Sequence, residues 1–250
     1  MRLRSTDLIA DAWRLWRTDR QLLLGVAGLF WFLPALVLGV LIPPPPAMPA
    51  GAEPTLRQLL LRLDALQDWM ANGGGWILLG PAIGAVGTLA VWALYLDRTR
   101  PDLRGGLLLG VALWPRYMLF SAMAGLMALV GLALWVLPMF WVLGRLLPAG
   151  PALVAERPLG AAAALARGFA LSRAANLPLA ALSAATFGLG WIAQRPLLAL
   201  DTWLRGQPDG ANPVALLVVD ALTAAIDAGV ATATALLAVA AYRRLASKGI

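Results

Sequence analysis

The chain has 250 residues, of which 60% are hydrophobic and 13% are charged, and its formal net charge is +7. Its mean hydropathy of +0.76 exceeds what a soluble domain of this size tolerates. The hydrophobic residues occur in long charge-free runs, which indicates a lipid bilayer rather than a large buried core. The basic residues lie in short clusters between these runs, as orienting loop charges do, so we expect no nucleic-acid partner.

Two residue types are missing from the sequence, and their absence narrows the chemistry. There is no cysteine, which excludes disulfides and thiolate catalysis. There is no histidine, which removes the commonest metal ligand and general base. We therefore expect no cofactor, no metal and no enzymatic activity.

Residues 5–20 predict an amphipathic helix, because apolar residues recur there at helical spacing and charged residues take the opposite side. Such a helix is typical of a membrane surface, with tryptophans inward and arginines toward lipid headgroups. The residues expected to contact lipid here are Trp13, Arg14, Trp16, Arg17 and Arg20. A cleaved signal peptide is the alternative, but this charged segment is longer than the short n-region that cleavage requires.

Six apolar segments follow, each able to cross a bilayer or nearly so, since about 20 residues at 1.5 Å each cover the hydrocarbon core. They are residues 22–42, 76–96, 117–137, 139–155, 177–193 and 214–241. Prolines at 43–46 end the first segment, and Pro138 separates the third from the fourth. The predicted fold class is an all-α integral membrane protein. It is one polytopic domain over residues 1–250, with six transmembrane helices in three hairpins.

Amphipathic interfacial helices are expected between these spans, at residues 55–71 and 157–176 as well as 5–20. The third of these segments carries Arg167 and Arg173, two further candidates for lipid contact. Residues 195–210 are interpreted as an interfacial piece and a polar loop, in which Asp201 would be solvated. Glycines at 80, 84 and 87 predict close helix contact of the small-xxx-small kind, unless they are merely tolerated in an apolar helix.

The distribution of basic residues orients the six spans. With the N-terminus inside, the inner segments hold fifteen of the twenty cations: Arg2, Arg4, Arg14, Arg17, Arg20, Arg98, Arg100, Arg104, Arg116, Arg157, Arg167, Arg173, Arg243, Arg244 and Lys248. Treating residues 117–155 as a single span would place much of this charge outside, against the positive-inside bias. We therefore expect both termini in the cytoplasm.

One stretch, residues 134–176, resembles a known family. The residues that carry the resemblance are Pro138, Arg145, Pro151, Val154, Glu156, the alanines at 161–164, and Leu171-Ser172-Arg173. They resemble the membrane domain that accompanies some bacterial glycerophosphodiester phosphodiesterases, and its stand-alone inner-membrane relatives. The chain has no counterpart of the phosphodiesterase's catalytic domain. The resemblance therefore implies a membrane module of the bacterial inner membrane without hydrolase activity.

Three charged residues fall inside predicted spans: Arg145, Asp220 and Asp227. An unpaired charge at this depth is costly, so such residues face the bundle interior, pair, or line water. One interpretation is a polar pathway or proton site. The favoured alternative is a structural pair between Arg145 and Asp227, whose depths match best, with Asp220 nearer the outer interface.

The sequence leaves three hypotheses about function. The first is a non-enzymatic membrane module, a scaffold or a helper in envelope homeostasis, whose partners are the bilayer and anionic lipid headgroups. The second is a small transporter or channel that uses a polar path near Arg145 and Asp227. The third, a membrane enzyme acting on lipids, has no paired-acid, histidine or cysteine motif to support it.

Overall fold

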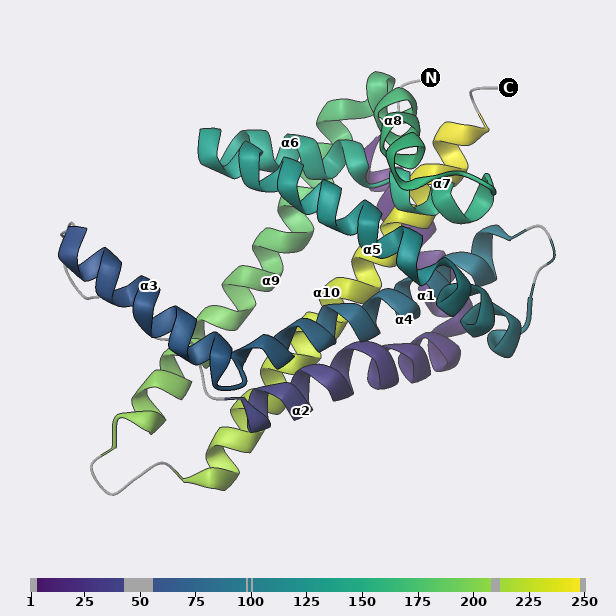
Figure 1. The fold of residues 1–250 in the computed structure, drawn as a ribbon. Coiled ribbons are helices and arrows are strands. Elements are labelled where there is room, and N and C mark those ends of the chain that lie inside the picture. Colours follow the sequence, from purple (N-terminus) through teal and green to yellow (C-terminus); the bar gives the residue numbers. More distant parts are fainter. Residues whose placement is uncertain (1–3, 43–55, 98, 100, 208–211, 248–250) are drawn as a thin grey trace.

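The computed structural model describes residues 4–42, 56–97, 99, 101–207 and 212–247, and this part of the chain is helical throughout, without strands (Figure 1). Six helical segments in it are long and apolar enough to cross a membrane. These are Ser5–Leu41, Gly75–Leu96, Leu103–Leu134, Val136–Ala155, Ala161–Arg205 and Pro213–Ala246. The predicted all-helical class is thereby confirmed, and the six segments are those expected of a multi-pass membrane protein. The predicted stop at residues 43–46 lies outside the described residues.

The elements follow the chain in a simple order. They are α1 (Ser5–Ala27), the π-helix η1 (Gly28–Phe32), α2 (Leu33–Leu41), α3 (Leu56–Ala71), the 3₁₀ helix η2 (Gly74–Leu78), α4 (Leu79–Leu96), α5 (Leu103–Leu134), α6 (Val136–Leu146), α7 (Ala149–Ala155), α8 (Ala161–Leu171), the 3₁₀ helix η3 (Ser172–Ala175), α9 (Asn176–Arg205) and α10 (Pro213–Ala246).

The first helical segment is continuous but not regular. α1 has non-helical dihedrals at Asp19 (φ −118°, ψ 28°), close to the boundary predicted between the surface helix and the first span. Farther on, Pro34 has no N–H, and its ring would collide with the carbonyl four residues earlier in a regular helix. The chain accommodates this by widening into the π-helix η1 directly before α2, a common relief at an internal proline.

Two predicted segment boundaries differ from the structure. α5 begins at Leu103, because Asp102 caps it by accepting a hydrogen bond from the backbone N–H of Gly105 (2.8 Å), so most of the predicted connection at 97–116 is helical. α9 likewise continues through Pro196 to Arg205, and the predicted interfacial loop begins only after this residue. Both helices therefore extend well beyond the apolar runs that reveal them.

The third and fourth spans separate at Trp135 rather than at Pro138. Trp135 is extended (φ 172°, ψ 170°) and breaks the helix between α5 and α6. Pro138 lies in the first turn of α6, where a backbone N–H has no partner within the helix in any case. The proline therefore fits the start of the helix and does not cause the break.

The packing partners of the long helices form a closed series. α1 packs on α10, α10 on α9, α9 on α6, α6 on α5, α5 on α4, and α4 on η1 and α2. The start of α1 and the end of α10 lie together, since Arg244 pairs with Asp7 (3.5 Å) and with Asp11. α3 projects away from these helices at the opposite side of the view in Figure 1.

The most buried element is the short helix α7. Its residues from Ala149 to Val154 are all buried, and it packs against α4, α5, α8 and α10. A Cβ at Gly150 would lie 2.3 Å from the ring of Trp92, so only glycine admits the indole here. Trp92 in turn donates its indole N–H to the carbonyl of Ala235 (3.2 Å), which satisfies its one polar group inside the core. α7 and Trp92 thus fill the bundle beside the helix ends where α1 and α10 meet.

Candidate functional site

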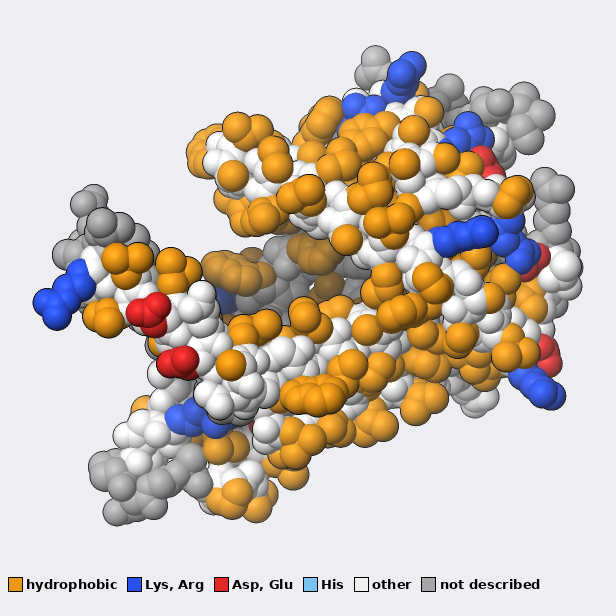
Figure 2. Space-filling model, in the orientation of Figure 1, with side chains coloured by type: hydrophobic (Ala, Val, Ile, Leu, Met, Phe, Trp, Pro, Cys, Tyr) orange, Lys and Arg blue, Asp and Glu red, His pale blue; other side chains and the backbone are white. Residues whose placement is uncertain are grey.

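A polar cleft of about 950 Å³ lies between α2, α4, α5, α9 and α10. Figure 2 shows the molecule hollowed between α5 and α6 on one side and α4 on the other. Most of the cleft wall is apolar. Its polar and hydroxyl-bearing side chains are Thr88, Tyr117, Ser121, Asp201, Arg205, Asp220, Thr223 and Asp227. This mixture of apolar wall and few polar groups is typical of a small-molecule site.

At one end of the cleft, three charged residues face each other from two helices. Arg205 binds both carboxylate oxygens of Asp201, one helical turn earlier on α9, at 2.9 and 3.0 Å. Asp220 on α10 lines the same end and comes close to Gly39 of α2. The prediction that Asp201 would be a solvated loop residue is therefore wrong. Its i,i+4 spacing to Arg205 was the signal in the sequence that could have placed both residues on a helix.

Deeper in the cleft, Asp227 accepts a hydrogen bond from the side-chain amide of Gln194 on α9. The Asp227 side chain remains exposed along the cleft, and Asp220 is half-buried. Asp220 and Asp227 are seven residues apart, so they lie on one face of α10, as their spacing predicted. Gln194 was not singled out from the sequence, because nothing local distinguishes an amide at the end of an apolar run.

The predicted pair between Arg145 and Asp227 is not formed. Arg145 donates to the backbone carbonyl of Phe169 (2.7 Å) and to the hydroxyl of Ser172 (3.2 Å). Its guanidinium also lies over the rings of Trp141 (4.9 Å) and Phe169 (4.7 Å). The physical reason is the position of α9, which packs against both α6 and α10 and provides the partner of Asp227.

Removing the Arg145 side chain tests this arrangement. We expect Arg145→Leu to lower the free energy of unfolding by about 1–2 kcal/mol, since it deletes hydrogen bonds made by a charged group. Adding Asp227→Leu should not restore the loss, and the two effects should add to within about 0.5 kcal/mol. Thermal unfolding of the single and double variants in detergent measures both. Recovery in the double variant would mean that the two charges do interact.

Other charged residues and two tyrosines gather where α1 and α8 meet the ends of α4, α7 and α10, in what we call the helix-end cluster: Asp7, Asp11, Asp19, Tyr95, Asp97, Glu156, Arg157, Arg167, Tyr242, Arg243 and Arg244. Arg167 donates to both carboxylate oxygens of Glu156 at 2.9 Å, and the Tyr242 hydroxyl donates to Glu156 at 2.9 Å. These bonds tie the end of α7 to α8 and α10. Because every partner comes from a different element, only the tertiary structure could identify them.

Asp97 and Arg157 form a second ion pair of this cluster, at 2.6 Å. Burial raises the pKa of the Asp97 carboxyl, but the backbone N–H of Thr99 and the charge of Arg157 outweigh it, so the pKa lies below its ordinary value of 3.8. The side chain of Asp97 is 5% exposed and that of Arg157 is 38% exposed, so solvent weakens the pair from one side.

A pH series tests the Asp97 pair. A carboxyl whose pKa is depressed by folding stabilises the protein above its unfolded pKa of about 3.9 and loses this contribution as pH falls through the folded pKa. We expect Asp97→Asn to be less stable than the parent chain by about 1–2 kcal/mol at pH 7. The difference should shrink as the pH is lowered from 5 toward 2, as followed by thermal unfolding. A difference that does not change with pH would contradict the pair's ionic character.

The residues predicted to contact lipid fall into two groups. Trp13, Arg17, Arg20 and Arg173 are exposed, and Trp16 is half-buried. Arg14, also exposed, is paired with Asp11. Arg167 forms an ion pair with Glu156, so its guanidinium already has a partner within the protein, although 42% of its side chain is exposed.

In the part of the chain that the structure describes, no three acidic side chains gather closely enough to hold a metal ion. The acids of the cleft are instead distributed along α9 and α10, and hydrogen-bonding and basic side chains line the cleft with them.

Comparison of the chain with protein-family models, with curated proteins and with solved structures gave no significant match. The fold and the cleft define a class: an all-helical protein with six candidate membrane spans in its described part and an acidic cleft among them. The resemblance of residues 134–176 to a phosphodiesterase-associated membrane domain remains a prediction.

Proposed function

We propose that the chain is a non-enzymatic polytopic membrane protein that binds an amphipathic cation in the polar cleft, as a small transporter does. The observation that carries the proposal is the cleft itself, which reaches Asp227 and has a volume of about 950 Å³. This volume lies in the range of pockets that enclose small organic molecules, about 300–1,000 Å³.

The charges in the cleft favour a cationic ligand. Three carboxylates, those of Asp201, Asp220 and Asp227, line it together with one cation, Arg205. Arg205 is bound to Asp201 and also attracts the nearby Asp220, so one cation faces three carboxylates, and the printed partner of Asp227 is the neutral amide of Gln194. A carboxylate at membrane depth is costly unless a charge, a polar group or water compensates it. A bound cation would supply this compensation, while its apolar part contacts the cleft wall.

The cleft lies toward one end of the bundle. Along α4 and α10 its lining runs from Gly80 to Thr88 and from Val219 to Ala231, before the parts of these helices that lead to the helix-end cluster. In the second halves, residues 89–93 and 235–241 are buried around α7. A transporter must expose its site to alternate sides of the membrane, and a site open at one end and packed at the other is what one state of that cycle requires. α7 and α8 are the elements that would have to move.

Binding of tetraphenylphosphonium tests the proposal, because this lipophilic cation carries one positive charge and no hydrogen-bond donor. We expect the purified protein to bind it, and Asp220→Asn and Asp227→Asn each to weaken binding about tenfold, the effect of losing one charge-assisted contact. Asp68→Asn is the matched control, since Asp68 is an exposed acid on α3 that does not line the cleft. Equal affinity of all four proteins would contradict a site in the cleft.

We infer further that the protein lies in the bacterial inner membrane as three hairpins with both termini in the cytoplasm. The support is the excess of basic residues in the segments assigned to the inner side, fifteen of twenty. Reporter fusions after Ile42, Asp97, Pro138, Arg157 and Gln194 should alternate between outside, inside, outside, inside and outside. A cytoplasmic signal from the fusion after Ile42 would overturn this topology.

A second candidate is a scaffold or homeostasis helper that acts through its surface helices and their contacts with anionic lipid. The observation in its favour is that Trp13, Arg17 and Arg20 are exposed near the start of the chain, where a surface helix would contact anionic lipid. This role requires no ligand in the cleft. Unchanged cellular function of the Asp220→Asn and Asp227→Asn variants would favour it over transport.

A further inference from the structure

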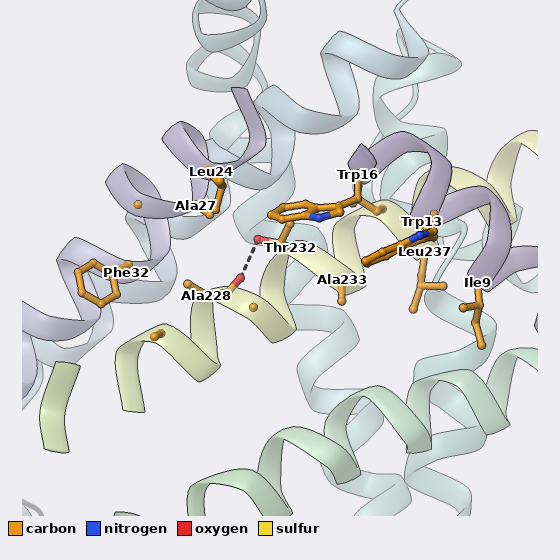
Figure 3. Close-up of a pocket in the computed structure, with 15 residues that line it drawn as sticks. Ile9, Trp13, Trp16, Leu24, Ala27, Phe32, Ala228, Thr232, Ala233 and Leu237 are labelled. Carbon is orange, nitrogen blue, oxygen red and sulfur yellow. Dashed lines mark hydrogen bonds between the residues drawn. The ribbon is translucent and has the colours of Figure 1, made fainter. Parts of the chain in front are cut away.

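An apolar groove of about 520 Å³ runs between α1 with η1 on one side and α10 on the other, separate from the polar cleft. We call it the α1/α10 groove (Figure 3). Trp13, Trp16 and Phe32 line one side, and small residues of α10, including Ala228, Gly229 and Ala233, line the other. The small residues leave a smooth wall along α10 on which a long flexible chain could lie.

The groove offers apolar contact and almost no hydrogen bonding. Its one hydroxyl, that of Thr232, donates to the backbone carbonyl of Ala228 at 2.7 Å, as Figure 3 shows. The indole of Trp13 is 59% exposed although it borders the groove. A ligand that fits this surface is therefore a hydrocarbon chain rather than a polar molecule.

The length of the groove matches one leaflet of a bilayer. Along α10 its lining extends from Ala225 to Leu237, which at 1.5 Å per residue is about 18 Å of helix. Half of a typical hydrocarbon core is about 15 Å thick. The groove is therefore long enough to take one acyl chain of a phospholipid.

Two basic side chains beside the groove indicate where a lipid headgroup would lie. Arg17 and Arg20 come between the lining residues Trp16 and Leu24, on either side of the bend of α1 at Asp19. Both arginines are exposed, and neither forms an ion pair within the described residues. Trp13 and Trp16, which line the groove, follow Asp11, the partner of Arg244 in the helix-end cluster, and tryptophans are enriched at membrane interfaces.

From these features we propose that the α1/α10 groove holds one acyl chain of an anionic phospholipid, with the headgroup phosphate against Arg17 and Arg20. A second apolar hollow provides the contrast. It has a similar volume, about 510 Å³, and is lined by Leu29, Val37 and Ile83 among others; neither wall contains a basic residue, but this hollow also has no arginine within four residues of its lining in the sequence. That hollow is expected to contact bulk lipid without choosing among headgroups.

Filling the groove is the direct test, and two glycines allow it. A Cβ at Gly28 or at Gly229 would meet no atom within 4 Å, so leucine at these positions projects into the groove without a clash at its first carbon. Gly25 is the matched control, because it is on the same helix, has equally open space and does not line the groove. The purified proteins are titrated with dioleoylphosphatidylglycerol and, separately, with dioleoylphosphatidylcholine, and bound lipid is counted by native mass spectrometry.

We expect the parent chain and Gly25→Leu to bind phosphatidylglycerol equally and in preference to phosphatidylcholine. The double variant Gly28→Leu/Gly229→Leu should bind about tenfold less of it, and Arg17→Gln/Arg20→Gln should lose about as much together with the headgroup preference. Undiminished binding by the filled variant, the same loss in Gly25→Leu, or equal binding of both lipids by the parent chain would each overturn the proposal.

A second measurement keeps the test decisive if the filled double variant does not fold. Ala233 is exposed and lines the groove, so Ala233→Leu narrows it with a single conservative change.

In addition, phosphatidylglycerol with a diazirine in its acyl chain is cross-linked to the parent protein in vesicles, and the labelled peptides are mapped. Labels concentrated on α1 and α10 support the groove, and labels spread evenly over all spans contradict it.

Discussion

Gly144→Leu should separate α6 from α9 and lower the free energy of unfolding by about 3 kcal/mol or more, the upper part of the range for overpacked positions. A Cβ at this position would lie 2.4 Å from the backbone nitrogen of Ala180, at the start of α9. Backbone atoms cannot rotate aside as a side chain can, so the two helices must move apart. Close contact through small residues is the main attraction between helices in lipid, and this contact would be lost.

The matched control is Gly188→Leu on α9, where a Cβ would meet no atom within 4 Å. Thermal unfolding and gel filtration in detergent compare the two variants with the parent chain. We also expect Gly144→Leu, and not the control, to weaken the contacts of the neighbouring Arg145 with Phe169 and Ser172. Equal tolerance of both substitutions would show that α6 and α9 are not in close contact.

Glu156→Ala should cost about 2–3 kcal/mol, because three hydrogen bonds to a carboxylate are lost at once and partial exposure reduces their worth. The change leaves Arg167 without its ion-pair partner and removes one acceptor of the Tyr242 hydroxyl. Since these bonds connect α7 to α8 and α10, the end of α7 should loosen. Thermal unfolding and hydrogen exchange of the α7–α8 segment measure this.

Two further variants separate the ion pair from a general effect of losing an acid. Asp68→Ala removes an exposed acid from α3 and should change stability by less than about 0.5 kcal/mol. Glu156→Ala/Arg167→Ala should be more stable than the sum of its single changes predicts, because the second change removes the charge that the first left unpaired. Strict additivity would argue against the pair.

The stretch that carries the family resemblance folds as a connected unit. Within it, Pro151 and Val154 are fully buried in α7, and Arg145 and Glu156 each bind residues of the following helical segment. These four of the positions quoted for the resemblance are therefore positions where this chain makes buried or charged contacts. Whether the same contacts define the family stays a prediction, and it is testable by the Glu156 and Arg145 variants in a relative.

The sequence by itself determined the helices and the candidate spans, because these depend on local properties. Charge-free apolar runs of about 20 residues require helices in a membrane, since every backbone polar group must be satisfied within its own segment. The sequence also predicted close helix contact at the glycines at 84 and 87, and these glycines do admit Trp31 and Phe30 of the first segment in close contact.

The tertiary structure alone decided which charges meet. Depth along the membrane suggested Arg145 and Asp227 as partners. Depth alone, however, does not determine which helix lies between the two residues or in which direction each side chain points from its helix. α9 provides Gln194 for Asp227, and η3 provides Ser172 for Arg145. The same holds for the cleft, the α1/α10 groove and the buried position of α7. Each depends on how helices distant in sequence pack, and no periodicity within a single helix records that packing.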